Sequence, residues 1–402
     1  MTDAGVVSPS LALVNAGTVL TGDLEHPVAE DADAVRCADG MITFVGPRSE
    51  LPDAELTVDV QGATIAPGLI DSHCHVVLGD YTPRQQTVGF LASYVHGGIT
   101  RCVSPGEIHA PGRPPDAAGV KALAIAARAC FEKFRPGGMR VHAGAVVLEP
   151  VLGEQDFADL AAAGVRLAKF GFGRYADPAD GVDQVRWAQR HGIIVMCHSG
   201  GASVPGSKPI TPEHLLLLRP DVCGHINGGP TSLREDGLEA IVRETPMALQ
   251  LVQAGNLRSS LRVLALARET GNLHRVVIGS DTPTGTGVMP LGMIKTVAEL
   301  ASLGGLPAAR AWALATGNVA RTWSLPAGLM EPGRAADVVV MDAPWGSVAT
   351  DAVGALDRGD IPGIGAVVTD GVVRSLTSRN TPLAARQVVV PAALSHLEGS
   401  PH

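Results

Sequence analysis

The sequence has few aromatic residues and few charged ones, and it contains no run of basic residues. Aromatic side chains make up 3% and charged side chains 18% of the 402 residues, and the formal net charge is -9 at pH 7. Because nucleic acids and anionic membranes attract clustered positive charge, this composition argues against both as partners. A small molecule is the partner that remains.

Long hydrophobic runs are also missing. No uninterrupted apolar stretch reaches the roughly 18 residues that a membrane-spanning helix needs. The first ten residues, MTDAGVVSPS, have neither the basic start nor the apolar centre of a secretory signal. We therefore expect a cytoplasmic protein.

The cysteines occur singly, so the sequence contains no Cys-x-x-Cys pair of the kind found in zinc knuckles and redox motifs. Three of the six lie within two residues of a histidine, and we interpret these as small buried residues in a reducing compartment. The six are Cys37, Cys74, Cys102, Cys130, Cys197 and Cys223.

The two ends of the chain show the same strand-turn-strand pattern. Residues 11–20 and 34–46 near the start, and 336–344 and 365–376 near the end, are short apolar runs separated by turn residues. Neither end alone has enough strands for its own core. We predict one small β-sandwich built from residues 1–63 and 326–380, with a tail at 381–402.

The middle of the chain, residues 64–325, alternates apolar strand-like runs with helical stretches, which is typical of repeated βα units and a parallel sheet. Eight such runs predict an α/β fold with a closed (β/α)8 TIM barrel. The runs are residues 63–76, 100–104, 139–148, 165–172, 192–200, 221–228, 247–253 and 275–283.

Polar side chains stand at the carboxyl ends of several of these runs, where the active sites of such barrels lie. His73 and His75 point to the same face of a strand because side chains alternate with a period of two. The residues that follow are spaced by about 30 residues per βα unit. They are Lys169, His198, His225 and Asp281.

Lys169 is the most unusual member of this set. A cationic lysine inside a barrel beside metal ions would suffer both desolvation and repulsion. A neutral amine can instead take up carbon dioxide and become a carbamate that bridges two cations. The alternative is an ordinary lysine that extends to the barrel mouth or pairs with a carboxylate; with four histidines and an aspartate nearby, we favour the carbamate.

The frame of residues 67–75, Lys169, His198, His225, Ser280-Asp281 and the closing stretch 332–337 resembles the amidohydrolase superfamily over nearly the whole chain. In the binuclear branch of that family, the resemblance makes His73, His75 and Asp281 ligands of the more buried metal. It makes His198 and His225 ligands of the second metal, with Lys169 as the bridge and a bridging hydroxide completing each sphere.

The resemblance also implies a reaction. The hydroxide attacks an amide carbonyl, and Asp281 acts as general base and then as general acid toward the leaving nitrogen. Histidine and carboxylate ligands suit zinc, which we expect, as well as iron, manganese, nickel or cobalt. The resemblance further implies a homo-oligomer, with a tetramer as the specific expectation.

Within the superfamily, the stretches 80–85, 111–114, 225–230 and 252–256 are most similar to enamidase, which opens a cyclic enamide. One position departs from that pattern, because enamidase is expected to have a bridging glutamate where this chain has Lys169. We therefore predict hydrolysis of a cyclic amide that resembles an enamide or a lactam.

Other functions remain as alternatives. A peptidase or an N-acyl amino acid hydrolase of the same superfamily is the nearest, and a non-catalytic barrel scaffold is a more distant one. A mononuclear deaminase would need a glutamate soon after His198, where the chain has Ser199-Gly200-Gly201. The sequence has no Gly-x-Ser-x-Gly elbow of a serine hydrolase and no phosphate-binding P-loop.

Substrate contacts are expected on the loops that follow the strands, although capping, turn or surface roles are equally compatible with each residue. Arg84 could hold a substrate carboxylate in a bidentate contact. Asp71 could orient a ligand histidine or stabilise a turn, and we assign His142 to the core. The remaining candidates are His109, Asn227, Gln253 and Asn256.

Overall fold

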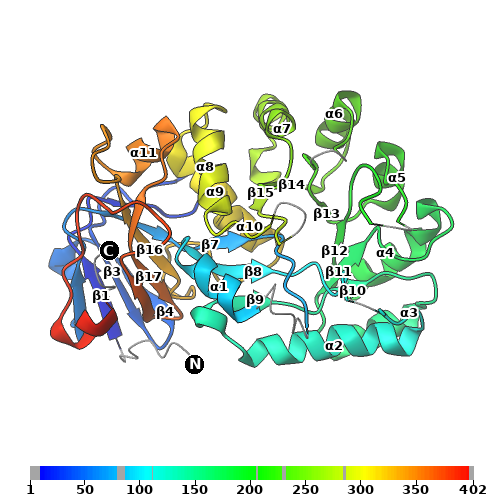
Figure 1. Ribbon diagram of the computed structural model, residues 1–402, viewed down its shortest axis with the longest axis horizontal. Helices are drawn as coiled ribbons and strands as arrows, with labels where there is room; N and C mark the ends of the chain where they lie inside the picture. Colours follow the sequence, from blue (N-terminus) through cyan, green and yellow to red (C-terminus); the bar gives the residue numbers. More distant parts are fainter. Residues whose placement is uncertain are drawn as a thin grey trace.

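A computed structural model describes residues 10–78, 87–110, 112–204, 207–228, 232–283 and 287–397. It is a mixed α/β fold with parallel sheets in the middle of the chain and mixed sheets formed by its two ends (Figure 1). None of the helices in these ranges is long and apolar enough to cross a membrane.

The parallel strands follow one another in space in the order in which they occur in the sequence. Three form one sheet, and six form a second in which every neighbour is parallel. The first sheet holds β7 (Leu69–Asp71), β8 (Ile99–Val103) and β9 (Arg140–His142). The second holds β10 (Val146–Val147), β11 (Leu167–Phe170), β12 (Ile194–Cys197), β13 (Val222–Cys223), β14 (Ala248–Val252) and β15 (Val276–Gly279).

The segments that follow β7 and β15 are joined by backbone hydrogen bonds. The amide of Asp281 donates to the carbonyl of His73 at 2.8 Å, and the amide of His75 donates to the carbonyl of Thr282 at 2.9 Å. A parallel bridge between Cys74 and Thr282 lies in the same place. The first and last parallel strands of the chain are therefore neighbours, and their carboxyl ends face the same side.

Helices connect the parallel strands and lie outside them (Figure 1). Their caps follow from local sequence: Asp116 accepts from the amide of Gly119 at the start of α2, and Asn256 accepts from that of Ser259 at the start of α7. The helices are α1 (Thr87–Val95), α2 (Ala117–Lys133), α3 (Glu154–Ala162), α4 (Val182–Arg190), α5 (Pro212–Leu218), α6 (Glu235–Glu244), α7 (Leu257–Glu269), α8 (Gly292–Ser302), α9 (Ala308–Leu314), α10 (Gly317–Thr322) and α11 (Ala352–Arg358). Short 3-10 helices are η1 (Arg48–Glu50), η2 (Pro136–Gly138), η3 (Pro178–Gly181), η4 (Leu273–Arg275) and η5 (Ala392–Leu397).

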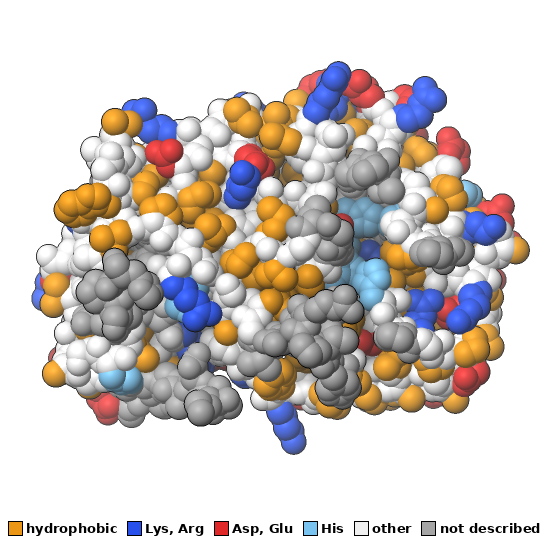
Figure 2. All heavy atoms as spheres, in the orientation of Figure 1, with side chains coloured by type: hydrophobic (Ala, Val, Ile, Leu, Met, Phe, Trp, Pro, Cys, Tyr) orange, Lys and Arg blue, Asp and Glu red, His pale blue; other side chains and the backbone are white. Residues whose placement is uncertain are grey.

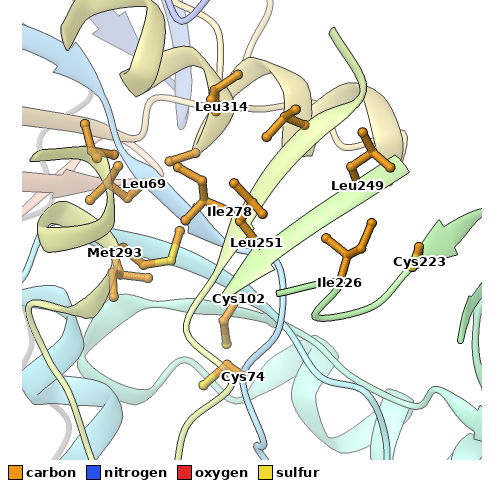
Figure 3. Packing of buried hydrophobic residues seen from close by; sticks show 14 of the residues in the cluster. Leu69, Cys74, Cys102, Cys223, Ile226, Leu249, Leu251, Ile278, Met293 and Leu314 are labelled. Atoms are coloured by element: carbon orange, nitrogen blue, oxygen red, sulfur yellow. The ribbon is translucent and has the colours of Figure 1, made fainter. Parts of the chain in front are cut away.

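Buried apolar side chains between the parallel strands and the helices form the largest core. Figure 3 shows Leu69, Leu251 and Ile278, which come from β7, β14 and β15, beside Met293 of α8 and Leu314 of α9. Each of these five side chains is at most 1% exposed. Burial of a side chain of this size contributes about 1.5–3 kcal/mol.

The cysteines near the predicted site are packed in the same core, as the sequence indicates. Cys74, Cys197 and Cys223 are buried and free of disulfide bonds. Their small apolar side chains fill space beside the histidines without offering the paired thiolates that a cysteine-rich metal site needs.

The two ends of the chain share a five-stranded sheet and add a four-stranded one. The order in the larger sheet is β18 (Val372–Leu376), β17 (Gly363–Thr369), β16 (Val338–Asp342), β6 (Thr64–Pro67) and β2 (Thr18–Val19). The order in the smaller sheet is β4 (Met41–Gly46), β3 (Ala34–Ala38), β1 (Ser10–Val14) and β5 (Leu56–Asp59). A second apolar cluster contains buried side chains from both sheets.

The run 63–76, predicted to be one strand, is divided at Gly68. Residues before it form β6 of the terminal sheet, and residues after it form β7 of the parallel sheet. A Cβ at Gly68 would lie 2.3 Å from the Thr100 side chain, so the chain changes sheet where only glycine fits. The run 139–148 is likewise divided, into β9 and β10.

The segment 381–397, predicted as part of a tail, contacts the terminal sheets. Val389 and Asp59 exchange backbone hydrogen bonds of 2.8 and 2.9 Å. Arg386 forms an ion pair with the buried Asp342, and Leu394 is fully buried. These contacts order the segment up to residue 397.

A buried ion pair connects the parallel strands to the terminal sheets. Arg101 of β8 pairs with Asp337, which directly precedes β16, and the two side chains are 2% and 3% exposed. Asp337 also accepts from the amide of Asp370 at 2.9 Å. Removing one partner of such a pair leaves a buried charge without compensation.

We predict that Arg101→Leu lowers the free energy of unfolding by about 3–5 kcal/mol, because the carboxylate of Asp337 loses its counter-ion. Urea denaturation followed by circular dichroism measures the change. Arg243→Leu is the matched control: Arg243 pairs with Glu239 and Glu269 at the surface, so its loss costs at most about 1 kcal/mol. Equal effects of the two substitutions would contradict the role assigned to Arg101.

Candidate metal centre

The predicted ligand residues lie at the carboxyl ends of the parallel strands. His73 and His75 follow β7, His198 follows β12, His225 follows β13 and Asp281 follows β15, while Lys169 lies within β11. Figure 2 shows histidine side chains gathered in a hollow on the face seen there. Parallel strands that end on one side bring residues from distant parts of the chain to one place.

His73, His75 and Asp281 form a compact group whose possible ligand atoms all lie within 4.8 Å of one another. Oδ1 of Asp281 is 2.9 Å from Nε2 of His75 and 3.4 Å from Nε2 of His73. Two nitrogens and one carboxylate oxygen are a donor set that zinc accepts with bonds of about 2.0–2.2 Å. Separations of about 3 Å between donors suit such bonds.

Asp281 is an anion held among imidazoles. Burial by itself would raise its pKa, but His73, the contact with His75, and His225 hold the pKa of the carboxyl well below its usual range. The side chain is therefore a carboxylate at neutral pH. A carboxylate can bind a cation and can accept a proton from a nearby water.

His198 and His225 form a second group. Nδ1 of His198 lies 2.9 Å from Nε2 of His225, and Nε2 of His198 donates to the carbonyl of Gly201 at 2.7 Å. The bond to Gly201 places the proton on Nε2, so the lone pair of His198 is on Nδ1 and faces His225. Burial lowers the pKa of His198 to about 4 and holds that of His225 well below its usual value, which keeps both imidazoles neutral, as metal ligands must be.

The two groups adjoin, because the rings of His73 and His225 are 5.6 Å apart. The buried Nδ1 of His75 has no hydrogen-bond partner among the described residues, so it remains available to a ligand. Imidazoles next to a carboxylate are a donor set that a divalent metal ion accepts.

Lys169 is buried, with 1% of its surface exposed. Its Nζ is 3.4 Å from the sulfur of Met196 and 5.7 Å from the ring centre of Phe172. Burial is the largest cause of the lowered pKa of His73, His198 and His225, and the charge of Lys169 lowers each pKa further. A thioether is a weak acceptor. Burial lowers the pKa of Lys169 to about 8, so a substantial fraction of the amine is neutral near physiological pH.

Gln250, on β14, fixes the orientation of His73. Its Oε1 accepts from Nδ1 of His73 at 2.7 Å and from the amide of His225 at 3.1 Å, and its Nε2 donates to the carbonyl of Ser72 at 3.0 Å. A proton on Nδ1 leaves the lone pair of His73 on Nε2, toward Asp281. This role could not be predicted from the sequence, because Gln250 is a single amide within an apolar strand.

Asp71 ties two ligand-bearing segments together. Its Oδ1 accepts from the backbone amides of His73 at 3.0 Å and of Ser280 at 2.8 Å. Asp71 therefore stabilises the backbone of the turns that precede His73 and Asp281. Burial raises the pKa of Asp71 to about 7.

His225 and Asp281 both have left-handed backbone conformations, with φ of 37° and 57°. Residues other than glycine adopt this region at a cost on the order of 1–3 kcal/mol, so the surrounding structure must hold them there. The surrounding hydrogen bonds, such as that from the Asp281 amide to His73, hold the strained residues in place.

The candidate substrate residues have different surroundings. The ring of His109 lies 4.9 Å from that of His75, so it borders the centre. Asn227 is fully buried and bonds to Val252 and Ser260, which favours a structural role. Arg84 lies outside the described residues. Gln253 accepts from Thr296 at 2.5 Å, and Asn256 caps α7.

A buried ion network stabilises one side of the centre. Glu149 is 1% exposed and pairs with Arg113 at 3.2 Å and with Arg174 at 3.5 Å. Arg113 also donates to the carbonyl of Phe172 at 2.6 Å. The network joins the segments that follow β8, β10 and β11. Of its charged residues, only Arg113 lies in a stretch noted for its similarity to enamidase, residues 111–114.

Comparison with known proteins gives a consistent result. A scan against protein-family models finds no match. Enamidase of Eubacterium barkeri is 43% identical over 375 residues, which cover 92% of this chain and 97% of that protein. The crystal structure of enamidase, described as a member of the amidohydrolase superfamily, superposes with a TM-score of 0.90 at 41% identity over 95% of this chain and all of that one.

The chain belongs to the amidohydrolase superfamily. An amidohydrolase from an environmental sample of the Sargasso Sea shares the fold at 16% identity, with a TM-score of 0.62 over 92% of this chain and 94% of that one. The expected resemblance to enamidase is therefore confirmed. In this amidohydrolase, the side chains of His73, His75 and Asp281 lie together.

We predict that Gln250→Leu weakens metal binding about 10-fold to 100-fold, because His73 loses the acceptor that sets its tautomer. Competition with a chromogenic chelator measures the affinity without any assay of activity. Gln250→Glu keeps an acceptor and should retain most of the affinity. Gln155→Leu, which removes an exposed amide on α3, is the control; a Gln250→Leu protein that binds metal as tightly as this control would contradict the role of Gln250.

Proposed function

We propose that this amidohydrolase opens the C–N bond of a cyclic amide of the enamide or lactam type, with two divalent metal ions bound by His73, His75, Lys169, His198, His225 and Asp281. Its family makes it a metal-dependent hydrolase of amide C–N bonds. The observation that carries the finer proposal is the His73, His75 and Asp281 group, in a chain that matches enamidase over nearly its full length.

The proposal includes the architecture that the sequence suggests. The parallel strands would close into a (β/α)8 barrel over residues 64–325, and the terminal sheets would form a sandwich from residues 1–63 and 326–380. Support comes from the hydrogen bonds between the segments after β7 and β15 and from the apolar cluster shared by the terminal sheets. In this arrangement the centre lies at the barrel mouth.

Asp281 would move the proton during the reaction. When bound, the metal pair supplies Lewis acidity toward the carbonyl and lowers the pKa of a water molecule. Asp281 accepts a proton from the attacking water while the new C–O bond forms, and it then gives that proton to the ring nitrogen as the C–N bond breaks. Its lowered pKa keeps it in the carboxylate form before the reaction begins. The products are a carboxylic acid and an amine or enamine on one opened chain.

Lys169 would carry a carbamate. The neutral amine attacks carbon dioxide, one N–C bond forms, and one proton leaves to solvent. The resulting anion replaces a buried cation, which offsets the positive charge of two metal ions. Support comes from the burial of Lys169, its pKa of about 8 and its thioether neighbour. We retain a cytoplasmic location and a tetramer as predictions.

A substrate panel tests the activity. After reconstitution with zinc and bicarbonate, we expect about two metal ions per chain and turnover of cyclic enamides or lactams, with dipeptides and N-acyl amino acids hydrolysed at least about 10-fold more slowly. Metal analysis and product detection by mass spectrometry give both answers. Preferential cleavage of dipeptides would replace this function with a peptidase, and a metal-free, inactive protein would indicate a non-catalytic scaffold.

We predict that Lys169→Ala abolishes activity, because the bridging anion is lost, and that short carboxylic acids such as formate or acetate partly restore it. The rate with and without added acid is the measurement. Lys121→Ala is the control, since Lys121 pairs with Asp156 and Asp159 at the surface and its loss should leave activity unchanged. A fully active Lys169→Ala enzyme would exclude the carbamate.

A further inference from the structure

A second cavity lies at the opposite ends of the strands from the metal centre. It has a volume of about 300 Å³ and is lined by the second half of α2, by β9, by the start of β11 and by residues 323–326. Leu167, the first residue of β11, lines the cavity, whereas Lys169, two residues nearer the carboxyl end of the strand, does not. The cavity is therefore separate from the site of hydrolysis.

The lining of this cavity is strongly basic, although the whole chain carries a net charge of -9. Four arginines contribute to it, namely Arg128, Arg135, Arg140 and Arg166, and the acidic residue in the lining is Glu132. We call these four side chains and the space between them the arginine pocket. Four guanidinium groups, from α2, from β9 and from the segments just before η2 and β11, form a concentration of positive charge that attracts anions.

The acidic neighbours only partly neutralise the arginine pocket. Glu132 pairs with Arg128 at 3.3 Å. Asp370 is shared, at 4.0 Å from Arg135, 3.6 Å from Arg140 and 3.4 Å from Arg101. Arg101 has its own partner in Asp337, so two carboxylates face four arginines and an excess of about two positive charges remains.

Arg166 illustrates this excess. Within the described chain its side chain donates to the backbone carbonyls of Ala161 and Val165, at 2.7 and 2.9 Å. These carbonyls carry no net charge and use one of the guanidinium nitrogens. A guanidinium has five N–H donors in a planar fork, so Arg166 retains donors for an anion.

Two buried nitrogen atoms in the lining have no hydrogen-bond partner among the described residues. They are Nε of Arg140 and Nε2 of His142. Burial, together with the charges of Arg101, Arg140 and Arg135, lowers the pKa of His142 to about 3, so its ring is neutral. Buried polar atoms are normally satisfied, and unsatisfied ones indicate a missing water, ion or ligand.

We propose that the arginine pocket binds a small oxyanion of charge about -2, such as phosphate or the phosphate group of a small metabolite. Such a dianion matches the excess charge, and its oxygens can accept from the guanidinium forks and from Nε of Arg140. The volume accommodates a phosphate with a modest organic substituent. This site is additional to the proposed amide hydrolysis and does not depend on it.

Calorimetric titration of the full-length protein with inorganic phosphate at low ionic strength tests the proposal. We expect saturable binding that Arg140→Gln and Arg166→Gln each weaken at least about 10-fold, since each removes charge-assisted hydrogen bonds. Arg190→Gln is the matched control, because Arg190 pairs with Glu154 at the surface and outside the pocket; it should bind phosphate like the wild type.

Arg166→Gln keeps the experiment decisive if Arg140→Gln fails to fold, because the side chain of Arg166 donates to backbone carbonyls and is not paired with Asp370 among the described residues. Succinate serves as the second ligand: tighter binding of succinate with the same loss in Arg166→Gln would keep the site and make its ligand a dicarboxylate. Absence of saturable phosphate and succinate binding, or equal affinity in Arg166→Gln and Arg190→Gln, would overturn the proposal.

Discussion

The structure depends on the placement of one partly buried carboxylate, that of Asp281, among imidazoles. A buried anion is stable only when positive charge or hydrogen bonds compensate for lost water. Here Nε2 of His75 is 2.9 Å from Oδ1 of Asp281, and a left-handed backbone at Asp281 aims the side chain inward. Cations at the same place would complete the compensation, which is why a metal centre is the economical explanation of the arrangement.

Much of the fold and the centre could be predicted from the sequence, because both rest on periodic patterns. Apolar runs about 30 residues apart predicted successive parallel strands, and the positions of His73, His75 and Asp281 at strand ends predicted their meeting, which the structure shows. The division at Gly68 was not predicted, because it results from the approach of Thr100. Thr100 is 32 residues away in the sequence, so the contact leaves no local pattern.

The residues that sequence reasoning missed are those whose role is to orient others. Gln250 and Glu149 lie near apolar strands, and their partners are His73, Arg113 and Arg174 from other elements. Asn227, expected on a binding loop, instead bonds inward to Val252. The arginine pocket could not be predicted either, because its members come from α2, β9 and the segments just before η2 and β11, and each is an ordinary arginine by itself.

The passage from β6 to β7 has a consequence for how this architecture can change. β6 pairs with β16 near the other end of the chain, and His73 follows Gly68 by only five residues. The peripheral sheet and the chemistry are thus encoded on one uninterrupted stretch. Recombination that exchanged the terminal sheet would have to break the gene within the few codons between β6 and His73. The terminal sheet and the first histidine of the centre are therefore inherited together.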